Sequence, residues 1–267
     1  MATSACARRD WCSPALNARK RWKRSAPRFA TGRRTSRFPT QPALEGEDYR
    51  TLLKRAHELL RPRTYLEIGV ESGATIRLAN PETLAIGIDP DPQLTEALPP
   101  NVCVFRATSD LFFARCNVIQ EFRGRPIDLA FIDGNHHFEF VLRDFINVER
   151  NCAPTSTILL HDCYPLDEVT AQRDRVTLFS TADAWKVVLC LKKYRPDLKI
   201  HTLACPPSGL TVVRGLDPTS RILASMLEAL YQEFIGLPYG VLTEDKPAAL
   251  NLVPGDWVTA RALLAVN

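Results

Sequence analysis

Four residues between positions 67 and 89 have types and spacing suited to binding a nucleoside. Glu67 lies near the end of an apolar run, Gly69 and Gly73 follow within six residues, and Asp89 comes directly after the next apolar run. Glycines let the backbone approach a ligand that a Cβ would block. A carboxylate after the second run can accept hydrogen bonds from both hydroxyls of a ribose. Apolar run, glycine turn, apolar run and acid, in this order, predict a nucleotide-binding βαβ unit.

The side chains in this turn disfavour a dinucleotide. A pyrophosphate site favours G-x-G-x-x-G with a helix N-terminus facing the anion. Here Glu71 stands at the middle glycine position, and Glu67 adds a second acid two residues before the first glycine. Both acids would repel a phosphate. They suit a ligand that carries a cation or an amine.

A second group of reactive side chains follows two later apolar runs. Asp133 and His136 come after the run that ends at Ile132, and His161 and Asp162 come after the run that ends at Leu160. Ligands of open α/β sheets bind outside the carboxyl ends of the strands, so both groups are expected at one edge with Glu67 and Asp89. A histidine with a pKa near neutrality is a suitable base for removing a proton from a hydroxyl.

These residues resemble two motifs of one enzyme family. Glu67, the two glycines and Asp89 are similar to motif I, E/D-x-G-x-x-x-G, and to the following ribose-binding acid of class I S-adenosylmethionine (SAM) methyltransferases. The run IDGNHHFEFVLRDF resembles the I-D-G-x-H-x-[FY]-E segment of a bacterial branch of small-molecule O-methyltransferases. The resemblance spans roughly residues 45–216. It implies a SAM-dependent methyltransferase that acts on a hydroxyl of a small molecule.

The resemblance also implies roles for individual residues. The expected cofactor-binding residues are Glu67, Gly69, Gly73, Asp89, Ser109 and Asp110. The expected catalytic residues are Asp133, His136 and His161, with one histidine as the base and Asp133 as its orienting acid or as a metal ligand. Some family members bind a divalent cation through acids at these places, which makes Asp133 and Asp162 metal candidates. His161 stands where such members have an acid, and this disfavours Mg²⁺ and leaves the presence of a metal open.

Other interpretations of the same residues remain at this point. The fold could bind SAM without turning it over, or could be an ordinary α/β protein in which the histidines are structural. A hydrolase using Ser72 with Asp133 and His161 is conceivable, although the spacing G-x-x-S-G departs from that of a nucleophile elbow. An NAD enzyme is disfavoured by Glu71. A P-loop NTPase is excluded because no G-x-x-x-x-G-K-[ST] occurs.

The apolar runs that position these groups predict an α/β fold. A helix over residues 45–60 precedes strands at 65–68, 84–88, 102–105, 127–132 and 157–160, separated by helical patterns. One of these patterns has Ser109 as its expected cap and continues through Phe122. The runs 198–203 and 210–213 are joined by too few residues for a parallel crossover. We therefore predict a Rossmann-like seven-stranded, mostly parallel sheet with an antiparallel C-terminal hairpin and helices on both faces. A long apolar helix is expected after Asp217, packed on the sheet or on a second copy of the chain.

Composition separates a basic tail from the rest of the 267 residues. Residues 1–44 carry 11 Lys or Arg and one acid, while the remainder has a net charge of −6, which argues against a nucleic-acid-binding face there. The tail is expected to be disordered, with a transit peptide or a misassigned start as alternatives. Residues 45–267 are expected to form one domain. The eight cysteines contain no C-x-x-C pair, and there is no apolar run long enough to span a membrane; a cytoplasmic location is expected.

Overall fold

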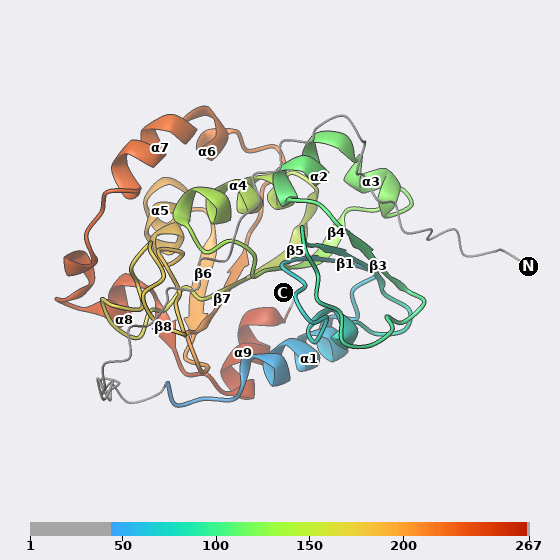
Figure 1. Ribbon diagram of the computed structural model, residues 1–267, viewed down its shortest axis with the longest axis horizontal. Helices are drawn as coiled ribbons and strands as arrows, with labels where there is room; N and C mark the ends of the chain where they lie inside the picture. The colour runs from blue at the N-terminus through green and yellow to red at the C-terminus, as the bar shows by residue number, and fades with distance from the viewer. Residues whose placement is uncertain (1–43, 266–267) are drawn as a thin grey trace, which may run out of the picture.

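A computed structural model describes residues 44–265 of the chain. The predicted basic tail therefore lies almost wholly outside the described residues. The described part is built around one sheet of eight strands in the order β3-β2-β1-β4-β5-β7-β6-β8 (Figure 1). The strands are β1 (Thr64–Ile68), β2 (Leu84–Ile88), β3 (Val102–Phe105), β4 (Ile127–Ile132), β5 (Cys152–His161), β6 (Lys199–Leu203), β7 (Leu210–Arg214) and β8 (Leu252–Val253).

The pairing of the strands confirms the predicted mostly parallel sheet. Strands β1 to β5 pair in parallel, whereas β7 lies antiparallel between β5 and β6. Strand β8, two residues long, adds an eighth strand that the sequence did not predict, because the run is too short to show a period. Since β1, β2, β4 and β5 are parallel, their carboxyl ends meet at one edge of the sheet.

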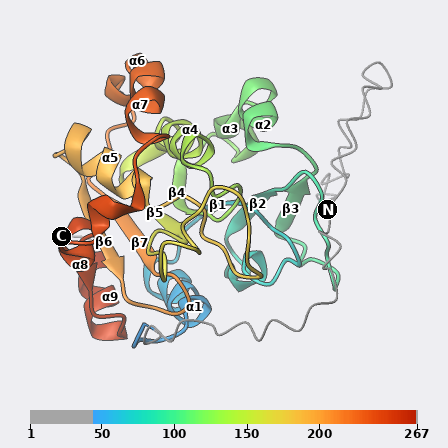
Figure 2. The same ribbon diagram turned by 60° about the vertical axis from the view of Figure 1, so that its left-hand side comes forward.

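Helices cover both faces of the sheet. The α-helices are α1 (Tyr49–Leu60), α2 (Ser109–Arg115), α3 (Val118–Glu121), α4 (Phe138–Glu149), α5 (Lys186–Tyr194), α6 (Ile222–Ser225), α7 (Leu227–Phe234), α8 (Lys246–Ala249) and α9 (Trp257–Leu264), with 3₁₀ turns at Ile76–Leu78 and Tyr239–Leu242. Figure 1 shows α1 and α9 below the sheet and α2 to α7 above it, and Figure 2 shows α1 and α9 side by side.

The alternation of side chains along the strands builds two cores. In β1, Leu66 and Ile68 pack on the side of α4 and α5, while Tyr65 points to the other side and packs with Leu52 and Leu53 of α1. Both faces of the central strands are buried, which explains why their sequences are nearly continuous apolar runs.

Several helix boundaries differ from those predicted. Helix α1 begins at Tyr49, because the Asp48 carboxylate caps it by accepting from the backbone N–H groups of Arg50 and Thr51. The cap of α2 is Thr108 rather than Ser109. The helix expected to continue through Phe122 is interrupted at Asn117, whose side chain caps α3.

The helix expected after Asp217 is two short helices. Helix α6 ends at Ser225 and α7 begins at Leu227, with Met226 between them in a non-helical conformation. The apolar face of α7 is covered by the same chain: Phe234 is buried and stacks on Phe138 of α4 at 5.3 Å between ring centroids. Among the described residues, no helix is both long enough and apolar enough to cross a membrane.

Candidate active site

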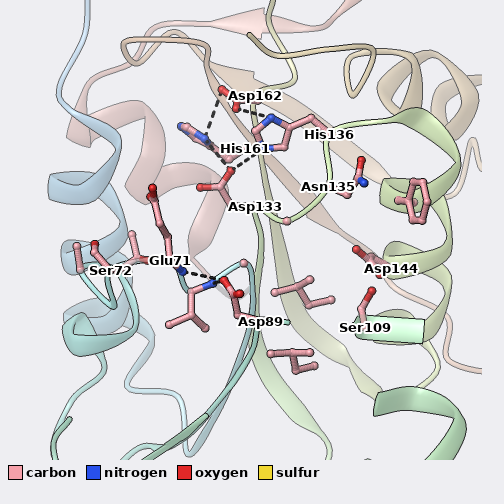
Figure 3. A pocket seen from close by; sticks show the side chains of 18 of the residues that line it. Glu71, Ser72, Asp89, Ser109, Asp133, Asn135, His136, Asp144, His161 and Asp162 are labelled. Carbon is pink, nitrogen blue, oxygen red and sulfur yellow. Dashed lines mark hydrogen bonds and ion pairs between the residues drawn. The ribbon is translucent and has the colours of Figure 1, made fainter. Parts of the chain in front are cut away.

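A cavity of about 850 Å³ opens at the carboxyl ends of β1, β2, β4 and β5 (Figure 3). Its walls come from the turn after β1, the ends of β2, β4 and β5, the first turns of α1 and α2, and one face of α4. The predicted residues that line it are Gly69, Asp89, Ser109, Asp110, Asp133, His136, His161 and Asp162. The strand ends thus bring together the two groups of side chains that lie apart in the sequence.

The glycine turn and Asp89 form one hydrogen-bonded unit. Asp89 Oδ2 accepts from the backbone N–H groups of Val70 and Glu71, at 2.9 Å each, and Oδ1 accepts from the N–H of Asp91 at 2.8 Å. Gly69 has φ +88°, and a Cβ there would lie 2.1 Å from the carbonyl oxygen of Asp133. Glycine at 69 is therefore required for the turn to pass against the end of β4.

Two of the predicted cofactor-binding residues do not line the cavity. Glu67 is fully buried, where it accepts hydrogen bonds from the hydroxyls of Tyr65 (2.7 Å) and Thr75 (2.8 Å). Burial raises its pKa to about 8, against the effect of those two donors. Gly73 has φ +80° and lies against the side chains of Arg77 and Leu94. Both residues therefore support the turn from the side that faces away from the cavity.

The wall opposite the turn is fixed by an ion pair. Arg143 of α4 donates to both carboxylate oxygens of Asp110 of α2, at 2.9 and 2.8 Å, and also donates to the Tyr231 hydroxyl. Asp110 lines the cavity with Ser109, but its carboxylate is already engaged by this guanidinium. The pair holds α2 against α4 and sets the width of the cavity at that end.

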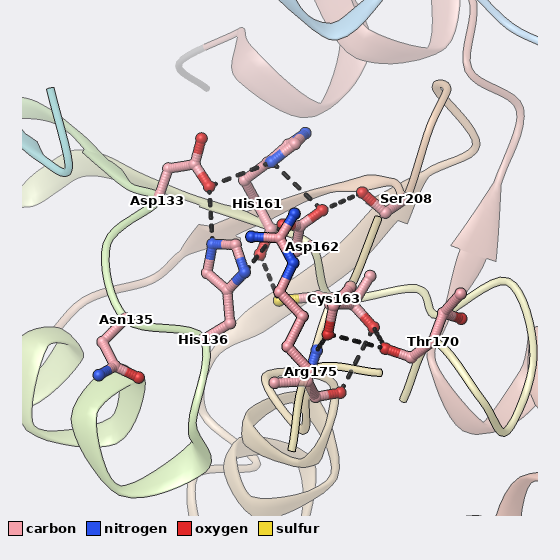
Figure 4. Close-up of polar contacts among 12 residues, drawn as sticks. Asp133, Asn135, His136, His161, Asp162, Cys163, Thr170, Arg175 and Ser208 are labelled. Atoms are coloured by element: carbon pink, nitrogen blue, oxygen red, sulfur yellow. Dashed lines mark hydrogen bonds and ion pairs between the residues drawn. The ribbon is translucent and has the colours of Figure 1, made fainter. Parts of the chain in front are cut away.

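Four side chains form a compact cluster at the other end of the cavity (Figures 3 and 4). His136 lies between two acids, with Nε2 3.2 Å from Asp133 Oδ1 and Nδ1 3.1 Å from Asp162 Oδ2. His161 Nδ1 is also 3.2 Å from Asp133 Oδ1. The hydroxyl of Ser208 donates to Asp162. His136 and Asp133 are about one quarter and one fifth exposed, whereas His161 and Asp162 are buried, so the first two face the cavity.

The charges in this cluster stabilise one another. Burial alone would lower the pKa of His136, but the hydrogen bond to Asp133 and the charges of the two acids raise it to about 9. Burial would likewise raise the pKa of Asp133, and the two histidines overcome this and lower it. His161 is held in the same way, since burial is outweighed by Asp133 and its pKa is raised. The ring of Tyr49 covers His161 at 4.1 Å between centroids.

Neighbouring motif residues have structural roles. Glu139 does not reach the cavity and instead binds Arg173 through both carboxylate oxygens, at 3.0 and 2.7 Å. Arg173 also donates to Asp183, and its carbonyl oxygen lies 2.9 Å from His137 Nε2. These contacts fasten the segment 164–180 to the start of α4. The contact of its Nε2 with the Arg173 carbonyl gives His137 a structural role.

The structure does not assemble a Ser72 triad. His161 contacts Asp133, but within the described part of the chain the Ser72 hydroxyl makes no hydrogen bond, and Figure 3 shows it on the far side of the cavity from His161. A nucleophile must lie within hydrogen-bond reach of its base. The hydrolase alternative therefore lacks its central contact.

The lining residues that were not singled out from the sequence as ligand contacts include four that lie on helices α1 and α4. They are Tyr49 and Arg50 of α1, Phe140 and Asp144 of α4. The helical period placed Tyr49 near an inward face, but nothing in the sequence indicated that α1 begins beside the ends of β4 and β5. Arg50 is the one Lys or Arg among the lining residues, which include seven Asp or Glu side chains within the described ranges.

The central segment of the chain matches a known family. Residues 66–163 match the model described as "Methyltransferase domain". This span runs from β1 to the residue after Asp162 and so includes the glycine turn, Asp89 and the histidine–acid cluster. The match confirms a methyltransferase domain over this segment. No curated protein matches the whole chain or part of it significantly.

Several solved structures are similar to the chain at low identity. The O-methyltransferase TomG from Streptomyces achromogenes, involved in tomaymycin synthesis and solved with SAM, is 15% identical; the match covers 63% of this chain and 80% of TomG, with a TM-score of 0.49. Cofactor-bound Rv0187 from MTB is 17% identical over 62% and 78%, with a TM-score of 0.47. The SAH-bound methyltransferase PaMTH1 from Podospora anserina is 14% identical over 63% and 78%, with a TM-score of 0.46. These similarities identify no acceptor for this chain.

Proposed function

We propose that this chain, whose residues 66–163 match a methyltransferase domain, is a SAM-dependent methyltransferase that methylates a hydroxyl oxygen of a small molecule. The observation that carries the proposal is the charge of the cavity. Among the described residues, its lining contains seven Asp or Glu side chains, two histidines and a single Arg, and one of the acids, Asp89, follows β2 in the ribose-binding position. SAM brings a sulfonium and an amine, which suit the acids, and one carboxylate, which suits Arg50.

The same charge distribution disfavours the NAD alternative. A pyrophosphate carries two negative charges and needs backbone N–H groups or cations around it. The N–H groups of Val70 and Glu71 in the turn are already bound by Asp89. A dinucleotide would therefore place its phosphates beside carboxylates without a compensating donor.

The cluster of Asp133, His136, His161 and Asp162 supports a role in proton removal. SAM, when bound, supplies a methyl group already activated on a sulfonium, so the chain has to orient the acceptor and take its proton. His136 is the histidine that faces the cavity. Because the pKa of His136 is raised to about 9, the neutral imidazole that can accept a proton predominates only at alkaline pH. In that neutral form, an acceptor hydroxyl that enters between His136 Nε2 and Asp133 Oδ1 replaces the contact of 3.2 Å between them and gives its proton to Nε2 as the methyl group moves to its oxygen. Asp162, at Nδ1, stabilises the imidazolium that forms.

A metal at the same atoms is the second candidate. Asp133, His136 and Asp162 each offer a ligand atom, and these atoms lie within 4.8 Å of one another. One imidazole and two carboxylates fit Mn²⁺, Fe²⁺ or Zn²⁺ better than Mg²⁺, which prefers oxygen ligands. The residues would hold the ion, which would polarise the acceptor oxygen. Titration of Mn²⁺ into the wild type and into Asp162→Asn tests this: equal heats from both proteins contradict a metal held by these residues.

The function itself is tested by binding and by transfer. We expect S-adenosylhomocysteine (SAH) to bind the wild type in isothermal titration calorimetry, and radiolabelled methyl from SAM to appear on phenol or sugar hydroxyls of an acceptor panel. A positioned base contributes about 10²- to 10⁴-fold, so His136→Gln should lower kcat by at least about 10²-fold with little change in the Kd for SAH. Failure of the wild type to bind SAH contradicts the proposal. SAH binding without transfer to any acceptor favours a SAM-binding protein without turnover.

We also propose a cytoplasmic location for this enzyme, on the basis of its buried thiols. Cys152, Cys163, Cys190 and Cys205 are buried among apolar side chains, and burial raises the pKa of the Cys163 and Cys190 thiols to about 12. Thiols of this kind are unreactive and suit a reducing compartment such as the cytoplasm. A homo-oligomer was considered because the apolar face of α7 needed a cover. The same chain covers that face, so α7 no longer supports an oligomer.

A further inference from the structure

Asp144 of α4 is an acid that neither the motifs nor the proposed chemistry uses. It lines the cavity, its side chain is buried, and its Oδ1 has no hydrogen-bond partner within the described residues. Burial raises its pKa to about 7, partly opposed by the Ser109 hydroxyl. A buried carboxylate oxygen without a donor is costly, and such atoms in native proteins usually have a partner. The missing partner is therefore expected to come from a ligand in the cavity.

Within residues 44–265, the guanidinium neighbouring Asp144 is already engaged and does not fill this role. Arg143 points to Asp110 with two nitrogens and to the Tyr231 hydroxyl with the third. The same guanidinium lies 4.6 Å from the centroid of the Phe140 ring, which fixes it further. The carboxylate of Asp144 thus lies on a wall that is held rigid without its participation.

The position of Asp144 indicates which part of a nucleoside would reach it. Figure 3 shows Asp144 and Ser109 together on one wall, across the cavity from the turn that carries Glu71, with Asp89 between them and the cluster of Asp133 at the far end. A ribose held by Asp89 with its reacting end toward Asp133 directs its base away from that cluster. The base then lies toward Ser109 and Asp144.

Resting on the proposed use of SAM, we propose that Asp144 reads the adenine ring by accepting a hydrogen bond from its exocyclic amino group. A carboxylate accepts hydrogen bonds only, and the adenine amino group is a donor, so the pair is complementary. Hypoxanthine carries a carbonyl oxygen at the same place, which a carboxylate repels. Asp144 would then make the site selective for an adenine nucleoside.

The test compares two ligands in two proteins. Isothermal titration measures the Kd of SAH and of S-inosylhomocysteine, which differ at the exocyclic group of the base, for the wild type and for Asp144→Asn. We expect the wild type to favour SAH by about tenfold or more, as for a hydrogen bond to a charged group. Asn supplies an N–H that can donate to the carbonyl of hypoxanthine, so Asp144→Asn should lose most of this preference or reverse it.

Asp110→Asn is the matched control, because Asp110 lies on the same wall with its carboxylate bound by Arg143. Loss of this ion pair should weaken the binding of both ligands alike, so we expect the variant to keep the preference for SAH. A switch of preference in Asp110→Asn but not in Asp144→Asn would assign the reading to Asp110 and overturn the inference. Equal binding of both ligands by the wild type would overturn it as well, without any variant. If the wild type binds neither ligand, the proposed function fails instead.

Discussion

Replacement of Gly69 by Ala tests whether the glycine turn and the end of β4 act as one unit. Gly69 has φ +88°, and a Cβ at this position would lie 2.1 Å from the carbonyl oxygen of Asp133 and 2.6 Å from its carbonyl carbon. Both atoms belong to the backbone, so no side-chain rotation can relieve the contact. The turn or the end of β4 must move, and Asp133 moves with it.

The expected loss of stability has two parts. A left-handed conformation costs a residue with a Cβ about 1–2 kcal/mol. Forcing an extra carbon into a packed site adds typically 1–3 kcal/mol. We therefore expect Gly69→Ala to lower the free energy of unfolding by about 2–5 kcal/mol.

Gly124 separates these two parts. Its φ is +84°, nearly that of Gly69, but a Cβ there would meet nothing within 4 Å. Gly124→Ala should therefore cost only the conformational part, about 1–2 kcal/mol. The difference between the two variants measures the contact with Asp133.

Urea denaturation gives the free energy of unfolding of each variant, and titration calorimetry gives the Kd for SAH. We expect Gly69→Ala to be the less stable variant and to bind SAH at least about tenfold more weakly, which corresponds to about 1.4 kcal/mol. Gly124→Ala should bind SAH as the wild type does. If both variants lose equal stability and bind SAH equally, the proposed coupling between the turn and Asp133 is wrong.

Three further predictions concern buried charge and the cavity. Burial raises the pKa of Glu67 to about 8, so between about pH 4.5 and 8 the folded state keeps a proton that the unfolded state has released, and the stability of the wild type falls as pH rises. Glu67→Gln should remove this loss, on the order of 1 kcal/mol per pH unit, and parallel pH profiles in urea denaturation would contradict it. Arg195, buried with its guanidinium on both oxygens of Glu149 at 2.7 and 2.9 Å, leaves an unpaired buried acid when replaced, so Arg195→Met should cost about 3–5 kcal/mol and the double variant with Glu149→Gln should recover part of it. Arg50→Gln should weaken SAH binding by about tenfold, as measured by calorimetry, whereas Arg55→Gln, on the same helix but outside the cavity lining, should not.

The parts of the fold predicted from the sequence are those that depend on period and spacing. The apolar runs correctly predicted strands β1, β2 and β4, and the short connection between β6 and β7 correctly predicted their antiparallel pairing. What was missed depends on single side chains that compete with a helix. Asn117 divides the helix expected across α2 and α3, because its side chain caps a new helix by accepting from the backbone N–H of Gln120. The spacing of apolar residues carries no information about such a side-chain hydrogen bond.

The site shows the same limit. The sequence brought Asp133, His136, His161 and Asp162 together because all four follow parallel strands. It assigned Glu67 to the ligand because Glu67 precedes the turn, but the side chain points to the α1 face, where Tyr65 and Thr75 bind it. The direction of one side chain at a strand end depends on the pleat and on its neighbours, and motif spacing carries neither. The sequence did not single out Asp144, since only the packed structure shows that its Oδ1 has no hydrogen-bond partner among the described residues.

The contact between the two ends of the described chain has a consequence for shortened versions of the protein. Helix α9 packs beside α1, and the Trp257 N–H donates to Glu47 just before α1 begins. A version ending at Val253 would keep all of the segment matched to the methyltransferase family. It would nevertheless remove the helix that packs against α1. Helix α1 carries Tyr49, whose ring covers His161, so that contact would lose its support as well. The segment matched to the methyltransferase family therefore ends at residue 163, but the cavity wall formed by α1 also depends on α9, almost one hundred residues further along the chain.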